Sequence, residues 1–452
     1  MQTMSAVLLC SRRFVTEASL ACTIWSGPEV GRADSLRLRN VDIVVLALVA
    51  GLPWSTSLTS ILGVVLFFGI LTTFRTERML ATISHPAGAL PLALVMLAAI
   101  GVTWASGVPW PERLSALGKM TKLLLLPLLL FHFQSSRRAK WMFATFVGSN
   151  MILLVYSFVS SAVPELAIVQ RIGGHGVPVR NYIDQSQGFS LVAVALAGLA
   201  FEAASQQKHY WVAALGAVSL LFFANLAFIN VARTAFFYLP IMLVLLTIRY
   251  SSPRTASVGF IGICILCGAL WQTSPNLQRK VSAIFVEMAA FQPDAEIGEK
   301  EPSAAERLEF WRKSFQFIER APVLGHGTGS IRRLFGQESI GRTGISALVV
   351  SNPHNQTLAA AVQWGSVGIL LVWAMWIAHV RLFCSRALVA WIGMLATVQN
   401  IASSIFNSHL MDAYEGWLYV LVVGIAGGEL LRIESRKPAP LDAAIAPGSR
   451  KC

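Results

Sequence analysis

Long apolar segments recur along nearly the whole chain. They are about 15–22 residues long, close to the roughly 20 residues that cross a lipid bilayer as a helix. Hydrophobic residues make up 55% of the sequence and charged residues 13%, whereas a soluble domain carries roughly 25% charged residues. The sequence therefore excludes an ordinary soluble enzyme and predicts an all-α, polytopic integral membrane protein with about 12 transmembrane helices. The predicted spans are residues 41–55, 58–74, 88–106, 116–134, 141–161, 186–204, 209–229, 232–249, 256–273, 356–378, 384–404 and 413–431.

The basic residues indicate the topology of these spans. The formal net charge is +13, but Lys and Arg are spread between apolar segments instead of forming the basic stripe of a nucleic-acid-binding protein, so we expect no nucleic-acid partner. With the N-terminus inside, the short inner segments hold 20 Lys and Arg and the short outer segments hold 6, as the positive-inside rule requires. The predicted organisation is an inner tail (1–40), transmembrane helices 1–9 (41–272), a large outer loop (273–355), transmembrane helices 10–12 (356–431) and a second inner tail (432–452).

The large outer loop contains a predicted amphipathic helix. Ser303 and Glu306 have the spacing of a capping box, so a helix should begin there, and Pro322 should end it. The apolar residues of this segment follow one another at helical spacing, which predicts one buried stripe. They are Ala304, Leu308, Trp311, Phe315 and Ile318. Arg307 lies beside this stripe, where it belongs either to a solvated basic face or to a membrane-surface helix that offers arginines to a phosphate.

Two further motifs complete the loop. Gly325, Gly327 and Gly329 stand at alternate positions; their backbone can cradle an anion, and a plain turn is an equally fair interpretation. His354 and Asn355 directly precede the tenth predicted span. A histidine there is either a general base for a hydroxyl group or an interfacial side chain, with Asn355 or Asn352 as a helix cap.

Three arginines lie in the other outer segments. Arg233 follows the turn before the eighth span, and Arg171 and Arg180 lie in the 161–185 loop. Each either reaches the membrane interface or faces a polar cavity. The outer loops show no D-x-D, no H-E-x-x-H and no carboxylate cluster, so the sequence predicts no metal site. A histidine and several arginines that face outward suit an anionic, lipid-linked substrate and a proton-accepting step.

In combination, these motifs resemble the O-antigen ligase and polymerase superfamily of polytopic glycosyltransferases. The resemblance spans roughly residues 160–430. Its motifs are Arg307 with Trp311, Ala321–Gly329, Pro353–Leu358, Gln363–Gly368, Ala232–Thr234 and Arg171–Gly174, together with Asn407–Gly416, which is similar to the ligase branch. Ala232 departs from the serine that is common at that position in the family.

The resemblance implies a GT-C-like glycosyltransferase without metal or other cofactor. Ligases of this superfamily transfer O-antigen polysaccharide from undecaprenyl diphosphate to the lipid A–core, an inverting reaction of lipopolysaccharide biosynthesis at the periplasmic face of the bacterial inner membrane. The outer loop would thus be periplasmic and the inner tails cytoplasmic. His354 would be the catalytic general base, while Arg233 and Arg307 would bind the donor diphosphate and stabilise charge on the leaving group. Further substrate-binding candidates are Arg171, Arg180, Asn355, Gly325 and Gly327.

Other functions stay open at this point. An O-antigen polymerase or a protein O-oligosaccharyltransferase of the same superfamily would use the same phosphate and base residues. A multi-pass transporter also fits twelve spans with both termini inside, but transport sites need charged or broken helices near the middle of the membrane, and here the ionisable residues concentrate outside the spans. A scaffolding membrane protein would need neither the histidine nor the arginines.

Overall fold

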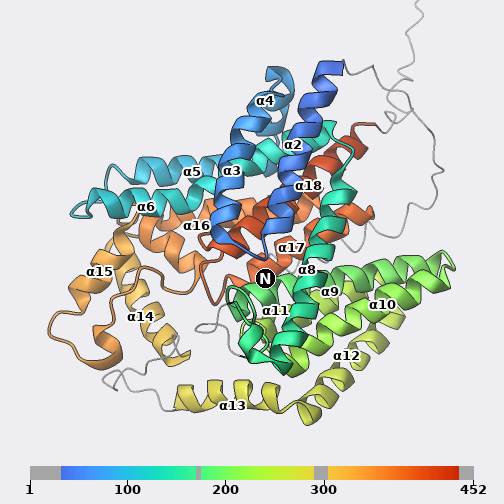
Figure 1. The fold of residues 1–452 in the computed structure, drawn as a ribbon. Helices are drawn as coiled ribbons and strands as arrows, with labels where there is room; N and C mark the ends of the chain where they lie inside the picture. The colour runs from blue at the N-terminus through green and yellow to red at the C-terminus, as the bar shows by residue number, and fades with distance from the viewer. Residues whose placement is uncertain (1–31, 169–174, 290–303, 437–452) are drawn as a thin grey trace, which may run out of the picture.

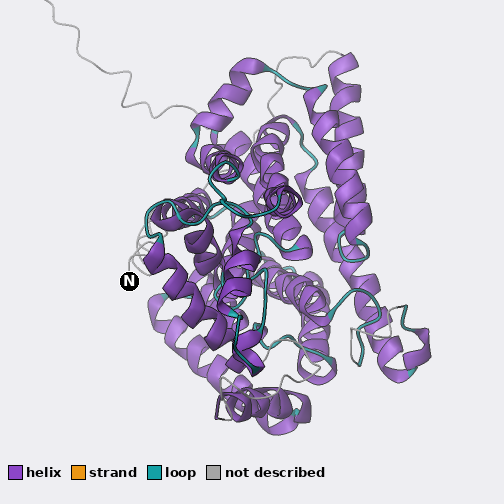
Figure 2. Ribbon diagram, turned by 90° about the vertical axis from the view of Figure 1, so that its left-hand side faces the viewer, coloured by secondary structure: helices purple, strands orange, loops and turns teal. Residues whose placement is uncertain are grey.

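The computed structural model describes residues 32–168, 175–289 and 304–436. Within these ranges the chain forms helices joined by loops, and no strand is present (Figure 2), so the predicted all-α class is confirmed. The first half contains α2 (Arg32–Gly51), α3 (Thr56–Leu71), α4 (Thr76–Ser84), α5 (Pro86–Gly101), α6 (Trp110–Met120), η1 (Thr121–Leu124), α7 (Leu125–Ser135), α8 (Ala139–Ala162), η2 (Pro164–Leu166), α9 (Tyr182–Ser205) and α10 (His209–Ala224). The second half contains η3 (Asn225–Ile229), α11 (Ala235–Tyr250), α12 (Pro253–Thr273), α13 (Pro275–Ala289), α14 (Ala304–Arg320), α15 (Ser330–Glu338), η4 (Gly344–Ala347), α16 (Gln356–Leu382), α17 (Leu388–Ser403) and α18 (Ala413–Glu434).

Six helical segments in the described ranges are long and apolar enough to cross a membrane, and two bent helix pairs raise the number to eight if each pair is one span. The bends are 83° between α4 and α5 and 94° between α12 and α13. The helices α3, α11 and α17 are apolar but shorter. Each of the twelve predicted spans overlaps a helix, yet length and composition support only six to eight membrane spans. Some predicted segments run past the helix into an apolar turn, as in 88–106, where α5 ends at Gly101. Others are shorter than the helix, as in 141–161, which lies within α8.

The N-terminal boundaries differ from the prediction in one respect. The predicted tail reached residue 40, but α2 already begins at Arg32; its first part is polar, so hydrophobicity alone placed the start too late. The predicted break between the first two spans is confirmed, since α2 ends at Gly51 and α3 begins at Thr56. Ser55 caps α3 by accepting a hydrogen bond from the backbone N–H of Leu58.

Close helix packing surrounds α18. Of the six spanning segments it is the most enclosed, with 72% of its apolar window buried inside the protein, and it packs along α7. A Cβ atom on Gly424 would lie 2.6 Å from the Cβ of Leu129, and one on Gly428 would lie 2.6 Å from the carbonyl oxygen of Leu130. Only glycine permits this approach, as at many helix contacts in membranes. This packing holds α18 against α7, and the candidate site lies beside the first turn of α18.

The helices α13, α14 and α15 lie together at the periphery of the molecule (Figure 1), and α14 contacts both α13 and α16. The predicted stripe on α14 is only partly buried: Trp311 and Ile318 pack against a buried apolar cluster. Leu308 and Phe315 are exposed, whereas Phe310, Lys313 and Phe317 are buried. Phe310 and Phe317 pack against α15 and the first turns of α16 in a small separate core. In a protein that faces lipid, apolar residues also lie on the outside, so the stripe did not identify the buried face.

The glycine loop clamps α16 at a break. Gly365 interrupts α16 with φ 60° and ψ −151°, a conformation available only to glycine. The N–H groups of His326 and Gly327 donate to the carbonyl oxygens of Val362 and Gln363, and that of Ser366 donates to Pro322. This contact joins the end of α14 rigidly to the helix that His354 precedes.

Candidate active site

His354 lies in the short connection before α16. Its backbone is left-handed, with φ 54°, and its N–H donates to Oδ1 of Asn352 over 2.8 Å. Asn355 caps α16 by accepting from the N–H of Leu358 and donates its own Nδ2 to the carbonyl oxygen of Ile405. Asn355 thus has the capping role that was one of its two sequence interpretations, and it ties this connection to the loop before α18.

The imidazole of His354 is held in its neutral form. Its ring is stacked on Phe310 of α14, with ring centres 6.0 Å apart, and Nδ1 is buried without a hydrogen-bond partner among the described residues. Burial, and after it the positive charge of Arg307, lower the pKa of His354 to about 4, while the charge of Asp412 and a hydrogen bond with Asn407 act in the opposite direction. At neutral pH the ring is therefore unprotonated and able to accept a proton.

A network of side chains positions the backbone of His354. Nδ2 of Asn352 donates to Oδ1 of Asn407 over 2.8 Å, and Oγ of Ser408 donates to Oδ1 of Asn352 over 2.7 Å. Nδ2 of Asn407 in turn donates to Oδ2 of Asp412 over 2.9 Å. Sequence reasoning treated Asn407–Gly416 only as a family signature. The signal that was present is the concentration of short polar side chains directly before an apolar span.

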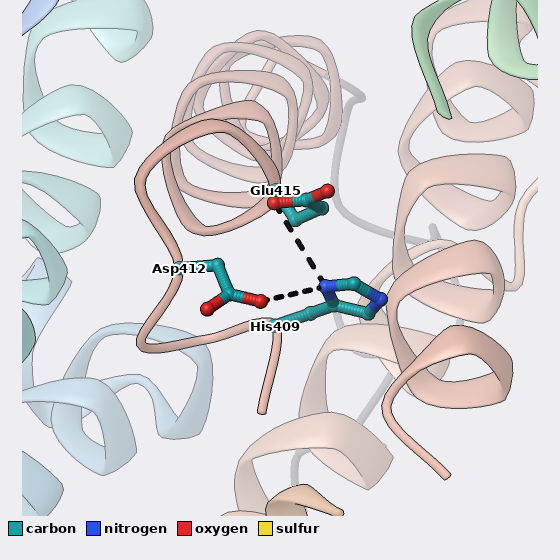
Figure 3. A group of neighbouring side chains, drawn as sticks. All are labelled: His409, Asp412 and Glu415. Carbon is teal, nitrogen blue, oxygen red and sulfur yellow. Dashed lines mark hydrogen bonds and ion pairs between the residues drawn. The ribbon is translucent and has the colours of Figure 1, made fainter. Parts of the chain in front are cut away.

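Beside this network, three titratable side chains converge at the start of α18 (Figure 3). Nδ1 of His409 lies 3.0 Å from Oδ2 of Asp412 and 3.8 Å from Oε2 of Glu415. The three offer ligand atoms within 4.8 Å of one another, a grouping that could hold a metal ion. The expectation that the outer segments hold no carboxylate cluster is therefore wrong, because the fold brings Asp412 and Glu415 together beside His409. Asp412 already has internal partners, because its carboxylate accepts from Asn407 and its carbonyl oxygen accepts from Nζ of Lys122.

Arg180 is committed to an internal ion pair. Its backbone is left-handed, with φ 61°, and its guanidinium group binds Oδ2 of Asp184 over 2.6 Å while it lies over the ring of Tyr414. Both charged side chains are almost completely buried. Arg180 therefore anchors the start of α9 to the start of α18. The other arginine of this loop, Arg171, lies outside the described residues.

Arg233 and Arg307 lie around one carboxylate. Arg233, in the turn before α11, forms a two-pronged pair with Glu287 of α13, with N–O distances of 2.7 and 2.8 Å. Glu287 also accepts from the N–H of Ala304, the first residue of α14, over 3.1 Å. The charge of Arg307, one turn into α14, acts on both Glu287 and His354. The structure thus brings Arg233, Arg307 and His354 to neighbouring positions.

The glycines of the loop play a different part. Gly325 and Gly327 have φ of 64° and 87°, and a Cβ atom on either would lie about 2.5 Å from the backbone of α16 or of Ala105. The N–H groups of Gly325, Gly327 and Gly329 all donate within the protein. They hold α16 in place, and the loop does not present these donors to an anion.

A cavity of about 740 Å³ borders the connection that contains His354. Ser351, Asn352 and Asp412 form part of its wall. The opposite walls are the apolar face of α3 and the end of α6 with η1, where Lys119 and Lys122 lie. The cavity therefore has an apolar side and a polar, basic side next to the network that holds His354.

Fold and site together define a polytopic, all-helical membrane protein in which an unprotonated histidine lies beside two arginines. A family model described as O-antigen ligase matches residues 217–373, a segment that contains Arg233, Arg307 and His354. The match confirms the resemblance that the motifs indicated and supports membership of the O-antigen ligase superfamily, with glycosyltransferase-type activity. No curated protein matches the chain.

Proposed function

We propose that this protein is an O-antigen ligase of the bacterial inner membrane. It transfers the polysaccharide from undecaprenyl diphosphate to a hydroxyl group of the lipid A–core at the periplasmic face, with both termini in the cytoplasm and each of the twelve apolar helices crossing the membrane. The observation that carries this proposal is a neutral histidine on which the charge of Arg307 acts, while the same charge also acts on the Glu287 carboxylate that Arg233 binds. A base and a phosphate site are the two elements that transfer from a diphosphate donor needs.

The reaction is a single displacement at the anomeric carbon. His354 accepts the proton of the acceptor hydroxyl as its oxygen forms the new bond to this carbon, and the bond between the carbon and the diphosphate oxygen breaks with its electron pair leaving on the diphosphate. Arg233 and Arg307 bind that diphosphate, and their charge stabilises the leaving group. One displacement inverts the anomeric configuration.

The two substrates approach from different sides in this proposal. The donor phosphates lie at Arg233 and Arg307, between α11 and α14. The acceptor enters from the 740 Å³ cavity, whose apolar wall suits acyl chains and whose Lys119 suits the anionic groups of a lipid A–core. Positioning two membrane-anchored substrates on either side of His354 supplies much of the rate enhancement, because both reactants are held in one geometry.

The test is ligation with purified protein. Lipid-linked O-polysaccharide and O-antigen-free lipopolysaccharide are incubated with the wild type, with His354→Ala and with His209→Ala, and the gel mobility of the lipopolysaccharide is followed. His209 is exposed at the start of α10, so its substitution controls for the loss of a histidine. We expect an upward ladder with the wild type and with His209→Ala, and at least about a hundred-fold loss of rate with His354→Ala, the magnitude typical of a missing general base.

Other outcomes identify the alternatives. Growth of the lipid-linked chain alone would indicate a polymerase, and transfer to a protein hydroxyl would indicate a protein O-oligosaccharyltransferase. Near-normal turnover in folded His354→Ala protein would show that the histidine is not the base. Absence of any transfer by folded wild-type protein would refute the ligase proposal and return the transporter to consideration.

A further inference from the structure

The surroundings of Glu287 are those of a bound anion. Its carboxylate receives two hydrogen bonds from the guanidinium group of Arg233, one from the N–H of Ala304 at the start of α14, and the electrostatic influence of Arg307. A guanidinium fork and a helix N-terminus are the two groups that proteins most often use to hold a phosphate. Here the acceptor is a carboxylate of the protein itself, that of Glu287, which accepts hydrogen bonds from both groups.

The helix that carries Glu287 is weakly held. None of the residues of α13 is buried, and its large apolar side chains, Phe285 and Val286, are exposed. Its other end is attached by Lys280, whose Nζ donates to Asn230 and to the carbonyl oxygen of Val231, and by Leu277, which packs against the main core. Little packing therefore opposes a movement of Glu287 away from Arg233.

We propose that Glu287 is an internal anion that occupies the phosphate position at Arg233 and the N-terminus of α14 and is displaced when a diphosphate-linked donor binds. This inference rests on the donor proposed above. In the empty site Glu287 compensates the charge of two neighbouring arginines and keeps them in place. When the donor arrives, its phosphate oxygens take over the same hydrogen bonds.

Competition for one position has a measurable consequence. A ligand that must displace an internal group binds more weakly. Its apparent dissociation constant is the intrinsic one divided by the fraction of molecules in which the position is free. Arg233 and Glu287 are both partly exposed, so their pair is of moderate strength. Glu287→Gln keeps an oxygen that can accept from Ala304 but removes the charge, so the donor KM should fall by about three- to ten-fold, with kcat little changed.

The matched control is Glu338→Gln. Glu338 of α15 also lies between two arginines, at 2.7 Å from Arg320 and 3.3 Å from Arg342, but it contacts neither Arg233 nor α14's first turn. Wild type, Glu287→Gln, Glu287→Ala and Glu338→Gln are purified as full chains in nanodiscs. Binding of undecaprenyl diphosphate is measured for each by thermal stabilisation, without any acceptor, and the KM for the lipid-linked donor is measured in the ligation assay.

Tighter binding by Glu287→Gln and Glu287→Ala, with Glu338→Gln like the wild type, is the expected result. Equal binding by all four proteins would overturn the inference and leave the ligase proposal intact. Weaker binding by the two Glu287 variants would also overturn it, because Glu287 would then help to build the phosphate site. Absence of binding by folded protein of every kind would overturn the donor site itself. Ligation failure despite normal diphosphate binding would refute the ligase proposal alone.

Discussion

The pH dependence of catalysis tests whether the observed surroundings of His354 set its chemistry. Burial, with the charge of Arg307, lowers its pKa from 6.5 to about 4. At pH 5.5 a histidine of pKa 6.5 would be about 90% protonated and one of pKa 4 only about 3%. Lowering the pH from 7.5 to 5.5 should therefore leave kcat/KM for ligation nearly unchanged, whereas an ordinary histidine base would lose about ten-fold.

The assay is initial-rate ligation between pH 5 and 8 at constant ionic strength, with donor well below its KM. Protein kept at pH 5.5 and assayed again at pH 7.5 controls for inactivation. An acidic limb centred near pH 6.5 would refute the reasoning, because the buried, neutral histidine would then not be the base in the free enzyme.

The same shift predicts a change in folding stability. The folded pKa lies below the unfolded one, so the unfolded chain binds more protons between these values, and stability falls as the pH is lowered from 6.5 to 4. A shift of this size corresponds to about 3 kcal/mol. His354→Gln should remove that part of the pH dependence in denaturant unfolding, and identical curves for the two proteins would contradict it.

Three further predictions follow from the contacts around the site. Gly365→Ala should destabilise the protein by at least about 2 kcal/mol, because its φ is 60° and a Cβ atom would lie 2.3 Å from the backbone of Val323. The control is Gly216→Ala, which has open space around it and should leave the unfolding midpoint unchanged or raise it. Equal effects of the two substitutions would refute the argument. Asn352→Ala removes hydrogen bonds to Asn407, Ser408 and the N–H of His354. It should lower the free energy of unfolding by about 1–3 kcal/mol and reduce kcat while changing KM less. An unaltered kcat would show that this network does not position the base. Ligation should persist in the presence of EDTA, since the carboxylate of Asp412 already accepts from Asn407 and pairs with His409. Loss of activity that a divalent cation restores would instead identify His409, Asp412 and Glu415 as a metal site.

The fold was predictable where a single physical cause dominates. Transfer of apolar side chains out of water selects helices of roughly 20 residues, and each predicted span overlaps a helix. Hydrophobicity does not predict the angle at which one helix follows the next. The 83° bend between α4 and α5 occurs at His85 and Pro86, where His85 caps α5 through Nδ1 and Pro86 occupies its first turn, a local geometry that an average over apolar residues does not detect.

The amphipathic helix α14 shows a second limit. Its stripe through Leu308 and Phe315 was assumed to face inward, as it would in a soluble protein, but these side chains are exposed. The buried face instead carries Glu309 and Lys313, and Nζ of Lys313 donates to the carbonyl oxygen of Ser346. Where lipid replaces water on one side, an apolar stripe no longer tells which side is the interior.

In the candidate site, too, features that depend on neighbouring residues in the sequence were predictable, and features that depend on distant residues were not. The position of His354 at the end of an outer loop made it a candidate, but its local sequence fitted a base and an interfacial side chain equally well, and the base role came from the resemblance of the combined motifs. Its positioning by Asn407 and Asp412 depends on the chain returning to it more than fifty residues later. A second long-range contact is the break at Gly365, which locks α16 to the glycine loop at the end of α14, and α14 carries both Phe310 and Arg307. One glycine thus couples the ring stacked on His354 and the charge that lowers its pKa to the helix that His354 precedes, so the proposed base and Arg307 of the proposed phosphate site keep a fixed relation to each other.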